Sequence, residues 1–416
     1  MGMKRENKFP PAGGGRKWQA EDRRPGDLAG VGMKRENKFP PAGGGRERRT
    51  EHRLTGALAG VGMWAASFCL ALALLLSVLG GRSGQPAFAE SAASETPAEQ
   101  TADASSAQSE AKKTSLTAVD DSFADDKWKL ILNQPALFHR MTYTDRETGL
   151  YIHYNIFLPE KYDKAAAYPL VLFLPDVTST GTDPELPLVQ GIGGLVWTAK
   201  EWQEQFPAIV VVPLYREAIL DHVYGYTTTG YVELTKNFVD FLRGEYAVDS
   251  SRIYGTGQGM GCEALMSIAS EDPGFFTACM FVSGQWDVNR LEALKDQKFI
   301  FFTAEDDRGA YRCAQRLMDR FAERGVGYAY SIWNGDWEPH DRTLSGIKLT
   351  VSETGHYFVF WRTGTIEPDS DEVKQAAGLA MVNPAVHVAS FNAAYRCVAV
   401  MEWLFGQAKV FYDVVK

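Results

Sequence analysis

The sequence predicts an α/β fold, a doubly wound and mostly parallel sheet with helices on both faces. Seven runs rich in β-branched and aromatic residues alternate with segments of helical periodicity. Most runs are apolar at successive positions, which is typical of strands covered on both faces. They lie at 150–158, 168–174, 208–212, 252–256, 278–282, 298–303 and 327–333. This alternation favours a parallel sheet wound by helices.

Between most of these runs, apolar residues recur at helical spacing. The predicted helices cover 231–245, 261–270, 310–324 and 390–407. The stretch 138–158 differs, because DRETG separates two alternating runs, and it predicts an antiparallel hairpin at the sheet edge. We interpret 345–366 as an inserted second hairpin.

Charge is unevenly distributed along the chain. The 416 residues carry a net charge of −9, with 45% hydrophobic and 23% charged residues, which is an ordinary globular composition. Residues 1–62 hold 14 basic and 7 acidic residues, whereas the part from Glu90 onward carries −17. So acidic a domain is a poor candidate for binding nucleic acid or an anionic membrane surface.

Residues 1–62 are a basic tandem repeat that we expect to be disordered. MKRENKFPPAGGGR occurs at 3–16 and again at 33–46, and neither copy has an apolar face that could stack. We favour a recent duplication upstream of a misassigned start over a functional basic tail.

Residues 63–89 have the pattern of a signal peptide. Basic residues precede the apolar run WAASFCLALALLLSVLG, and Ala87-Phe88-Ala89 is the small-x-small pattern that signal peptidase cuts. The run is about 16 residues, short for a membrane span of ~20, so an N-terminal anchor is the alternative. We expect a secreted, cell-surface or periplasmic protein. Residues 90–123 predict a disordered linker, and 124–416 the domain that carries the chemistry.

The cysteines of this domain predict no metal site. Cys262, Cys279, Cys313 and Cys397 lie in apolar segments, without CxxC or Cys/His spacing. Although export permits disulfides, such cysteines are more often small buried hydrophobes.

The loop after 252–256 is the most informative one. GQGMG (257–261) runs directly into a helix and has the frame of a nucleophile elbow, G-x-S-x-G, with Gly259 where the nucleophile belongs. A dinucleotide-binding turn is disfavoured, because G-x-G-x-x-G needs glycine where Met260 or Cys262 stands. No cofactor is therefore expected.

Four segments resemble one known group of proteins. They are RIYGTGQGMGCEA (252–264), SGQWD (283–287), FFTAEDDRGAY (301–311) and HVASFNAAYRCVAVMEWLFGQ (387–407). Over about 138–407 the sequence resembles the α/β-hydrolase superfamily, in its exported feruloyl-esterase-like, polyhydroxybutyrate-depolymerase-like and predicted peptidase-type serine hydrolase branch. The resemblance implies an α/β-hydrolase fold.

The resemblance also implies a catalytic triad. Gly259 occupies the nucleophile position, Asp307 that of the acid and His387 that of the base, in the order expected of this fold. In such a triad the imidazole takes the hydroxyl proton and the carboxylate fixes its tautomer. Asp306 is a rival acid, which the spacing from strand to loop disfavours.

Two other histidines are rival candidates for the base, His340 and His356. His340 follows the strand at 327–333 and would be the choice without the resemblance. His387 is preferred because it immediately precedes the terminal helix. His356 begins a strand-like run and is interpreted as structural.

Backbone N–H groups would form the oxyanion hole. Met260 supplies one, and the loop after 168–174 supplies the other from Val177 or Asp176, since Pro175 has none. An Asp176 carboxylate beside an oxyanion is unfavourable unless it points away.

Further residues are candidates for binding substrate. They are Gln190, Gln258, Gln285 and Trp286. The sequence around Trp197 and Tyr226 is equally consistent with pocket residues and with core residues. An aromatic-lined cleft suits an aryl or acyl group.

The sequence thus predicts an exported hydrolase of carboxylic (acyl or feruloyl) esters, small or polymeric, acting by acyl transfer through a serine at position 259. Losing a triad nucleophile costs about 10⁶-fold in kcat, so Gly259 predicts an inactive or impaired chain. The alternatives are a non-catalytic polymer- or carbohydrate-binding protein and a peptidase-type hydrolase. No nucleic-acid partner is expected, and membrane contact only through an uncleaved N-terminal segment.

Overall fold

The computed structural model describes residues 116–410. The tandem repeat, the signal segment and residues 90–115 of the linker lie outside the described residues. The packed domain begins earlier than the predicted residue 124. Val119 and Phe123 are buried and belong to the hydrophobic core.

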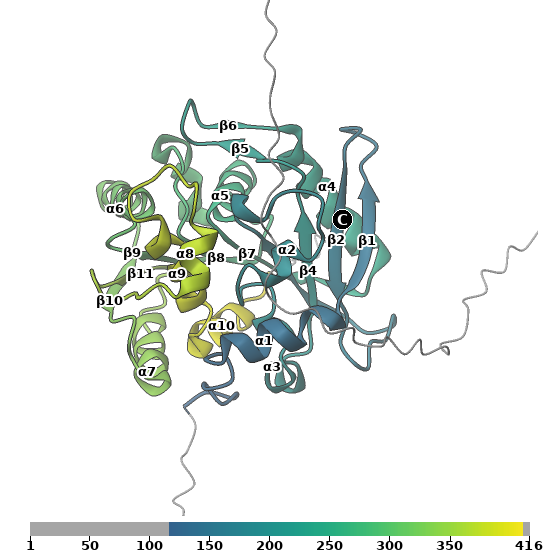
Figure 1. The fold of residues 1–416 in the computed structure, drawn as a ribbon, viewed down its shortest axis with the longest axis horizontal. Helices are drawn as coiled ribbons and strands as arrows, with labels where there is room; N and C mark the ends of the chain where they lie inside the picture. Colours follow the sequence, from purple (N-terminus) through teal and green to yellow (C-terminus); the bar gives the residue numbers. More distant parts are fainter. Residues whose placement is uncertain (1–115, 411–416) are drawn as a thin grey trace, which may run out of the picture. The chain divides into compact units, whose positions relative to one another are not determined.

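A nine-stranded sheet in the order β1-β2-β4-β3-β7-β8-β9-β11-β10 forms the centre of the domain (Figure 1). Its strands are β1 (His139–Thr144), β2 (Tyr151–Phe157), β3 (Tyr168–Leu174), β4 (Ile209–Leu214), β7 (Val248–Gln258), β8 (Ala278–Val282), β9 (Phe299–Ala304), β10 (Ala329–Trp333) and β11 (His356–Trp361). Within this nine-stranded sheet, only the β1–β2 and β2–β4 pairs are antiparallel. The predicted mostly parallel sheet and its N-terminal hairpin are therefore confirmed. A separate pair joins β5 (Leu220–Asp221) to β6 (Thr227–Thr228).

Helices and short 3-10 turns connect the strands. The α-helices are α1 (Lys127–Asn133), α2 (Leu186–Val189), α3 (Lys200–Gln205), α4 (Gly230–Glu245), α5 (Met260–Glu271), α6 (Arg308–Glu323), α7 (Pro339–Thr350), α8 (Ser370–Gln375), α9 (Pro384–Ala394) and α10 (Val398–Phe405). The 3-10 turns are η1 (Pro135–Leu137), η2 (Val177–Ser179), η3 (Val196–Thr198), η4 (Val288–Arg290) and η5 (Glu292–Asp296). None of the helices in residues 116–410 is long and apolar enough to cross a membrane.

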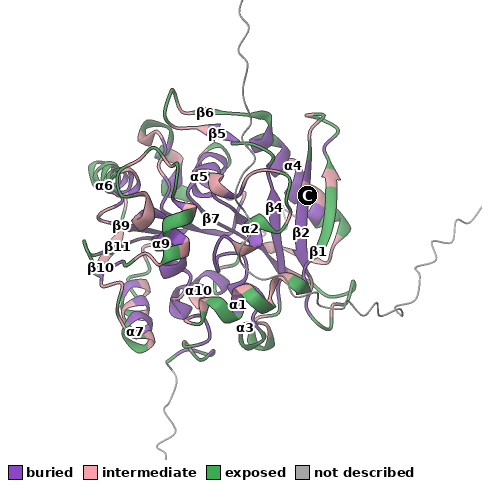
Figure 2. Cartoon of the chain, viewed as in Figure 1, coloured by how far each residue is buried: buried purple, intermediate pink, exposed green. Residues whose placement is uncertain are grey.

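Both faces of the sheet are covered, as expected for a doubly wound fold. Successive side chains of a strand point to opposite faces, so β3 sends Leu170 and Leu172 into one core and Val171 and Phe173 into the other. The first core also contains side chains of α4, α5 and α6, and the second those of α3, α9 and α10. The inner strands are buried along most of their length (Figure 2).

Two of the predicted elements are wrong. The stretch 345–366 is no hairpin: its first part belongs to helix α7, and its second part is β11, which lies between β9 and β10 in parallel register. All six β11 residues are buried, which an inserted surface hairpin would not allow. The predicted terminal helix 390–407 is two helices, α9 and α10, separated at 395–397.

The four cysteines of the domain are free and buried, as their apolar surroundings predict. Burial raises the pKa of the Cys262 thiol well above its ordinary value. Such a thiol is a poor nucleophile, because the reactive species is the thiolate.

Candidate active site

Gly259 forms the predicted sharp turn between β7 and α5. Its backbone has φ 51° and ψ −119°, a conformation that side chains rarely adopt. Its N–H donates to the Val282 carbonyl at 3.0 Å, which fastens the turn to β8. The strand, turn and helix of a nucleophile elbow are therefore present, and its central position carries no side chain.

Asp307 and His387 lie side by side at the carboxyl edge of the sheet. The Nδ1 atom of His387 is 2.7 Å from Oδ2 of Asp307, and both side chains are buried. Asp307 follows β9. His387 lies within α9, one turn into the helix, rather than before the terminal helix as predicted.

The rival residues lie elsewhere. Asp306 accepts a hydrogen bond from the Gly364 N–H at 2.7 Å. His340 is exposed on α7, and Nδ1 of His356 lies 2.9 Å from the Gly327 carbonyl oxygen. The structure thus brings together the acid and base positions that the resemblance implies.

Carboxylates around His387 favour its charged form. Burial lowers the pKa of His387, but the charge and hydrogen bond of Asp307 outweigh that effect, and Asp176 and Glu263 add to it. The net result is a pKa above the ordinary value.

The Asp176 carboxylate points into the site. A Cβ atom on residue 259 would lie 2.0 Å from Asp176 Oδ2, far inside van der Waals contact. The same oxygen accepts the Met260 N–H at 3.3 Å. Oδ1 accepts the N–H and the hydroxyl of Thr178 at 3.0 and 2.9 Å. Asp176 therefore fills the space of the missing side chain and engages a predicted oxyanion donor.

A cavity of about 390 Å³ opens at this point. Its lining comes from the ends of β3, β7, β8 and β9, from the β5 loop and from α9. The lining residues are Asp176, Val177, Leu220, Asp221, His222, Val223, Gly259, Met260, Glu263, Ser283, Gln285, Asp307, Gly309, Ala310, Leu379, Ala380, Met381 and His387.

Of the four residues predicted to bind substrate, only Gln285 lines this cavity. Gln190 and Gln258 lie behind it: the Gln258 amide donates to Gln190 Oε1 at 2.8 Å, and the same oxygen accepts the Asp176 N–H at 3.1 Å. They hold the Asp176 loop in place. Trp286 contacts Tyr226 edge-to-face and lines a different hollow.

Trp197, considered as a pocket residue, belongs to the core instead. It is fully buried, and its indole N–H donates to the Gly193 carbonyl at 2.8 Å.

The sequence reasoning missed a second histidine–carboxylate pair in the cavity. Nδ1 of His222 lies 2.9 Å from Oε2 of Glu263, whose Oε1 accepts the Gln285 N–H at 3.2 Å. The hydrogen bond to Glu263 raises the pKa of His222, although burial opposes it, and burial raises the pKa of Glu263. A detectable signal existed: Glu263 is an acidic residue within the apolar segment GCEALM, one turn after the elbow.

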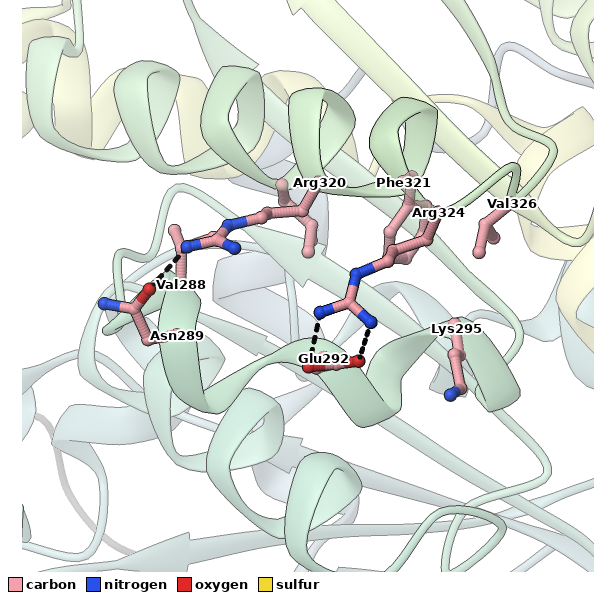
Figure 3. A pocket seen from close by; sticks show the side chains of 9 residues that line it. Val288, Asn289, Glu292, Lys295, Arg320, Phe321, Arg324 and Val326 are labelled. Atoms are coloured by element: carbon pink, nitrogen blue, oxygen red, sulfur yellow. Dashed lines mark hydrogen bonds and ion pairs between the residues drawn. The ribbon is translucent and has the colours of Figure 1, made fainter.

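A second hollow, of about 50 Å³, lies between α6 and η5 (Figure 3). Both of its arginines are paired with neighbours: Arg324 lies 2.9 Å from Glu292, and Arg320 donates to Asn289 at 2.7 Å. It is too small for an organic ligand. Within residues 116–410, no group of three His, Cys, Asp or Glu side chains is placed to hold a metal ion.

We expect the His387 imidazole to titrate above about pH 6.5, the ordinary value for histidine. Asp307→Asn removes the main charge that raises this pKa while burial remains, so the pKa of His387 should fall. NMR titration of the imidazole measures the change. Asp306→Asn is the matched control, since Asp306 bonds Gly364 instead. An equal fall in both variants would contradict the pairing.

Comparison with solved structures places the fold. A thermostable esterase matches with a TM-score of 0.51 at 23% sequence identity, over 66% of this chain and 64% of that one. The matched part is thus less than two thirds of that esterase. This likeness shows a shared α/β-hydrolase fold, as the sequence resemblance implied.

Two further matches are weaker. A variant of the feruloyl esterase module from Clostridium thermocellum, complexed with sinapinate, has a TM-score of 0.40 at 15% identity, over 64% of this chain and 91% of that one. The S-formylglutathione hydrolase from Staphylococcus aureus matches with a TM-score of 0.35 at 13% identity, over 53% of this chain and 98% of that one. No protein-family model and no curated protein sequence matches the chain.

Proposed function

We propose that this chain, which has the α/β-hydrolase fold, binds a ligand in its cleft without forming an acyl-enzyme. One observation carries the proposal: Asp176 Oδ2 lies 2.0 Å from the place where the side chain of residue 259 would begin. Acyl transfer needs a nucleophile at that place and free N–H donors beside it. Here the nucleophile is absent, and a carboxylate faces the Met260 donor.

No other lining residue supplies the missing nucleophile. The Ser283 hydroxyl is buried and lies 2.6 Å from the Ser390 hydroxyl. The Cys262 thiol, buried on α5 one turn from the elbow, has a strongly raised pKa and does not line the cavity. A negative charge at Asp176 would also repel a developing oxyanion.

The surrounding architecture supports an esterase-like ancestry of the site. The fold is shared with a thermostable esterase, and Asp307 and His387 retain the contact that a triad requires. With a serine at position 259 and the donors free, such a site would act on carboxylic esters, acyl or feruloyl, small or polymeric. A peptidase-type hydrolase is the second candidate. The signal-peptide pattern of residues 63–89 supports the proposal that the protein is exported.

We expect the unaltered chain to hydrolyse p-nitrophenyl acetate no faster than its His387→Ala variant, because neither has a nucleophile at position 259. Initial rates in matched buffers measure this, and intact-protein mass after treatment with a fluorophosphonate should show no adduct. A rate more than about 100-fold above that of the variant, or an adduct on an active-site residue, would overturn the proposal.

A further inference from the structure

The cavity is rich in acidic groups, and its only basic side chains among the described residues are histidines. Four carboxylates line it, from Asp176, Asp221, Glu263 and Asp307, whereas no Lys or Arg does so among the described residues. Two of the four are paired with histidines, Asp307 with His387 and Glu263 with His222.

Within residues 116–410 Asp176 makes no hydrogen bond or ion pair to a cationic side chain, although its charge contributes to the raised pKa of His387. It is buried, and its oxygens accept only from uncharged donors, the Thr178 N–H and hydroxyl and the Met260 N–H. A buried carboxylate without a counter-charge is costly unless a cation reaches it. The nearby charge of Asp176 also contributes to the raised pKa of Glu263, so the two carboxylates share one electrostatic environment.

The histidines add further acceptors. Nδ1 of His387 is engaged with Asp307, and Nε2 of this buried side chain has no hydrogen-bond partner among residues 116–410. Nε2 of the half-buried His222, whose Nδ1 contacts Glu263, likewise has no hydrogen-bond partner among these residues. Above the raised pKa of each imidazole its Nε2 is an acceptor, and both histidines line the same cavity.

From this arrangement we infer that the cavity binds a primary ammonium group carried on a small apolar body, with the ammonium held between Asp176, Glu263 and the His387 Nε2 atom. An ammonium offers three donors and no acceptor, which matches a wall made of acceptors. It would also supply the positive charge that Asp176 lacks.

The remaining lining fits the apolar part of such a ligand. Val177, Leu220, Met260, Leu379 and Met381 present aliphatic and thioether surface to the cavity. Methionine side chains adapt to irregular ligands, and a volume of about 390 Å³ suits a small molecule.

The test is isothermal titration calorimetry of the full chain at pH 8 with three probes of similar shape: benzylammonium, benzyl alcohol and benzoate. We expect benzylammonium to bind about 10-fold or more tightly than either of the others. A comparison of trialanine amide with its N-acetylated form then tests whether the ammonium of a peptide N-terminus binds in the same way. Equal or tighter binding of benzoate would overturn the inference.

Variants locate the ammonium. Asp176→Asn keeps the side-chain shape and removes the charge, so it should weaken benzylammonium about 10-fold and leave benzyl alcohol unchanged. Glu204→Gln, an exposed carboxylate on α3 paired with Lys200, is the matched control and should change nothing. An unchanged preference in Asp176→Asn would contradict the inference. If that variant is unfolded by circular dichroism, the probe series on the unaltered chain decides the question.

The inference rests on the proposed function, yet the two fail separately. An acyl adduct or rapid ester hydrolysis would refute the proposal that the cleft binds its ligand without forming an acyl-enzyme, whatever the calorimetry shows. A chain that is catalytically silent and prefers benzyl alcohol or benzoate would refute only the ammonium ligand.

Discussion

Gly259→Ser alone should leave the chain nearly inactive toward p-nitrophenyl acetate, whereas Gly259→Ser combined with Asp176→Ala should become an esterase. The new Cβ would lie 2.0 Å from Asp176 Oδ2, so the single variant has to displace a buried carboxylate that Thr178 holds by two hydrogen bonds. Removing Asp176 clears that space and frees the Met260 N–H. Initial rates of aryl-ester hydrolysis measure both variants.

The expected differences are large. An oxyanion-hole donor is worth about 10²–10³ in kcat, so the double variant should exceed the single one by about that factor. A complete triad is worth about 10⁶, and the double variant should exceed the unaltered chain by about 10⁴ or more.

Two controls make this result interpretable. Asp176→Ala alone should stay inactive because it has no nucleophile, and His387→Ala should abolish the activity of the double variant. Equal rates in the single and double serine variants would show that Asp176 moves aside freely and does not block the site. An inactive but folded double variant would mean that the cleft is not that of an esterase for small aryl esters.

Gly261→Ala should destabilise the domain by about 3 kcal/mol or more, because overpacking forces backbone shifts at a rigid contact. A Cβ at Gly261 would lie 2.0 Å from the Leu174 carbonyl oxygen and 2.4 Å from its carbon, both backbone atoms of β3. Neither can move without shifting the strand that carries Asp176. Chemical denaturation followed by circular dichroism measures the loss.

Gly244→Ala provides the comparison for this substitution. Gly244 is an exposed residue of α4, and no atom lies within 4 Å of the Cβ that alanine would add. Alanine should therefore stabilise the helix by roughly 0.5–1 kcal/mol. Similar losses in both variants would show that the close approach of α5 to β3 is unimportant for stability.

Periodicity alone determined most of the fold. Strands buried on both faces must be apolar at every position, and in the helices that cover them apolar residues must recur every 3.6 residues. The strands β3, β4, β8 and β9 were therefore predictable nearly to the residue. Of the two misread regions, 345–366 mixes the two patterns: a helix end with a β-branched run comes shortly before an aromatic strand. Local pattern does not tell an inserted hairpin from a strand in the middle of the sheet.

The elbow was also predictable, from its glycines, whereas its partners were predictable only from a resemblance. Glycines crowd the turn because strand and helix approach closely there, and this spacing is visible in GQGMG (257–261). Asp307 and His387 were placed through resemblance to known hydrolases, since 80 residues separate them and no local pattern links them.

Only the tertiary structure decided what fills the site. Whether Asp176 points toward Gly259 or away depends on the Thr178 and Gln190 contacts that set the loop after β3. Likewise, Glu263 becomes a cavity residue only because the loop with His222 folds over α5. Sequence thus determined which elements form and in which order, because those follow from local burial. The direction of each buried charge depends on contacts between distant segments, and the proposed blocked, acceptor-lined cleft rests on that direction.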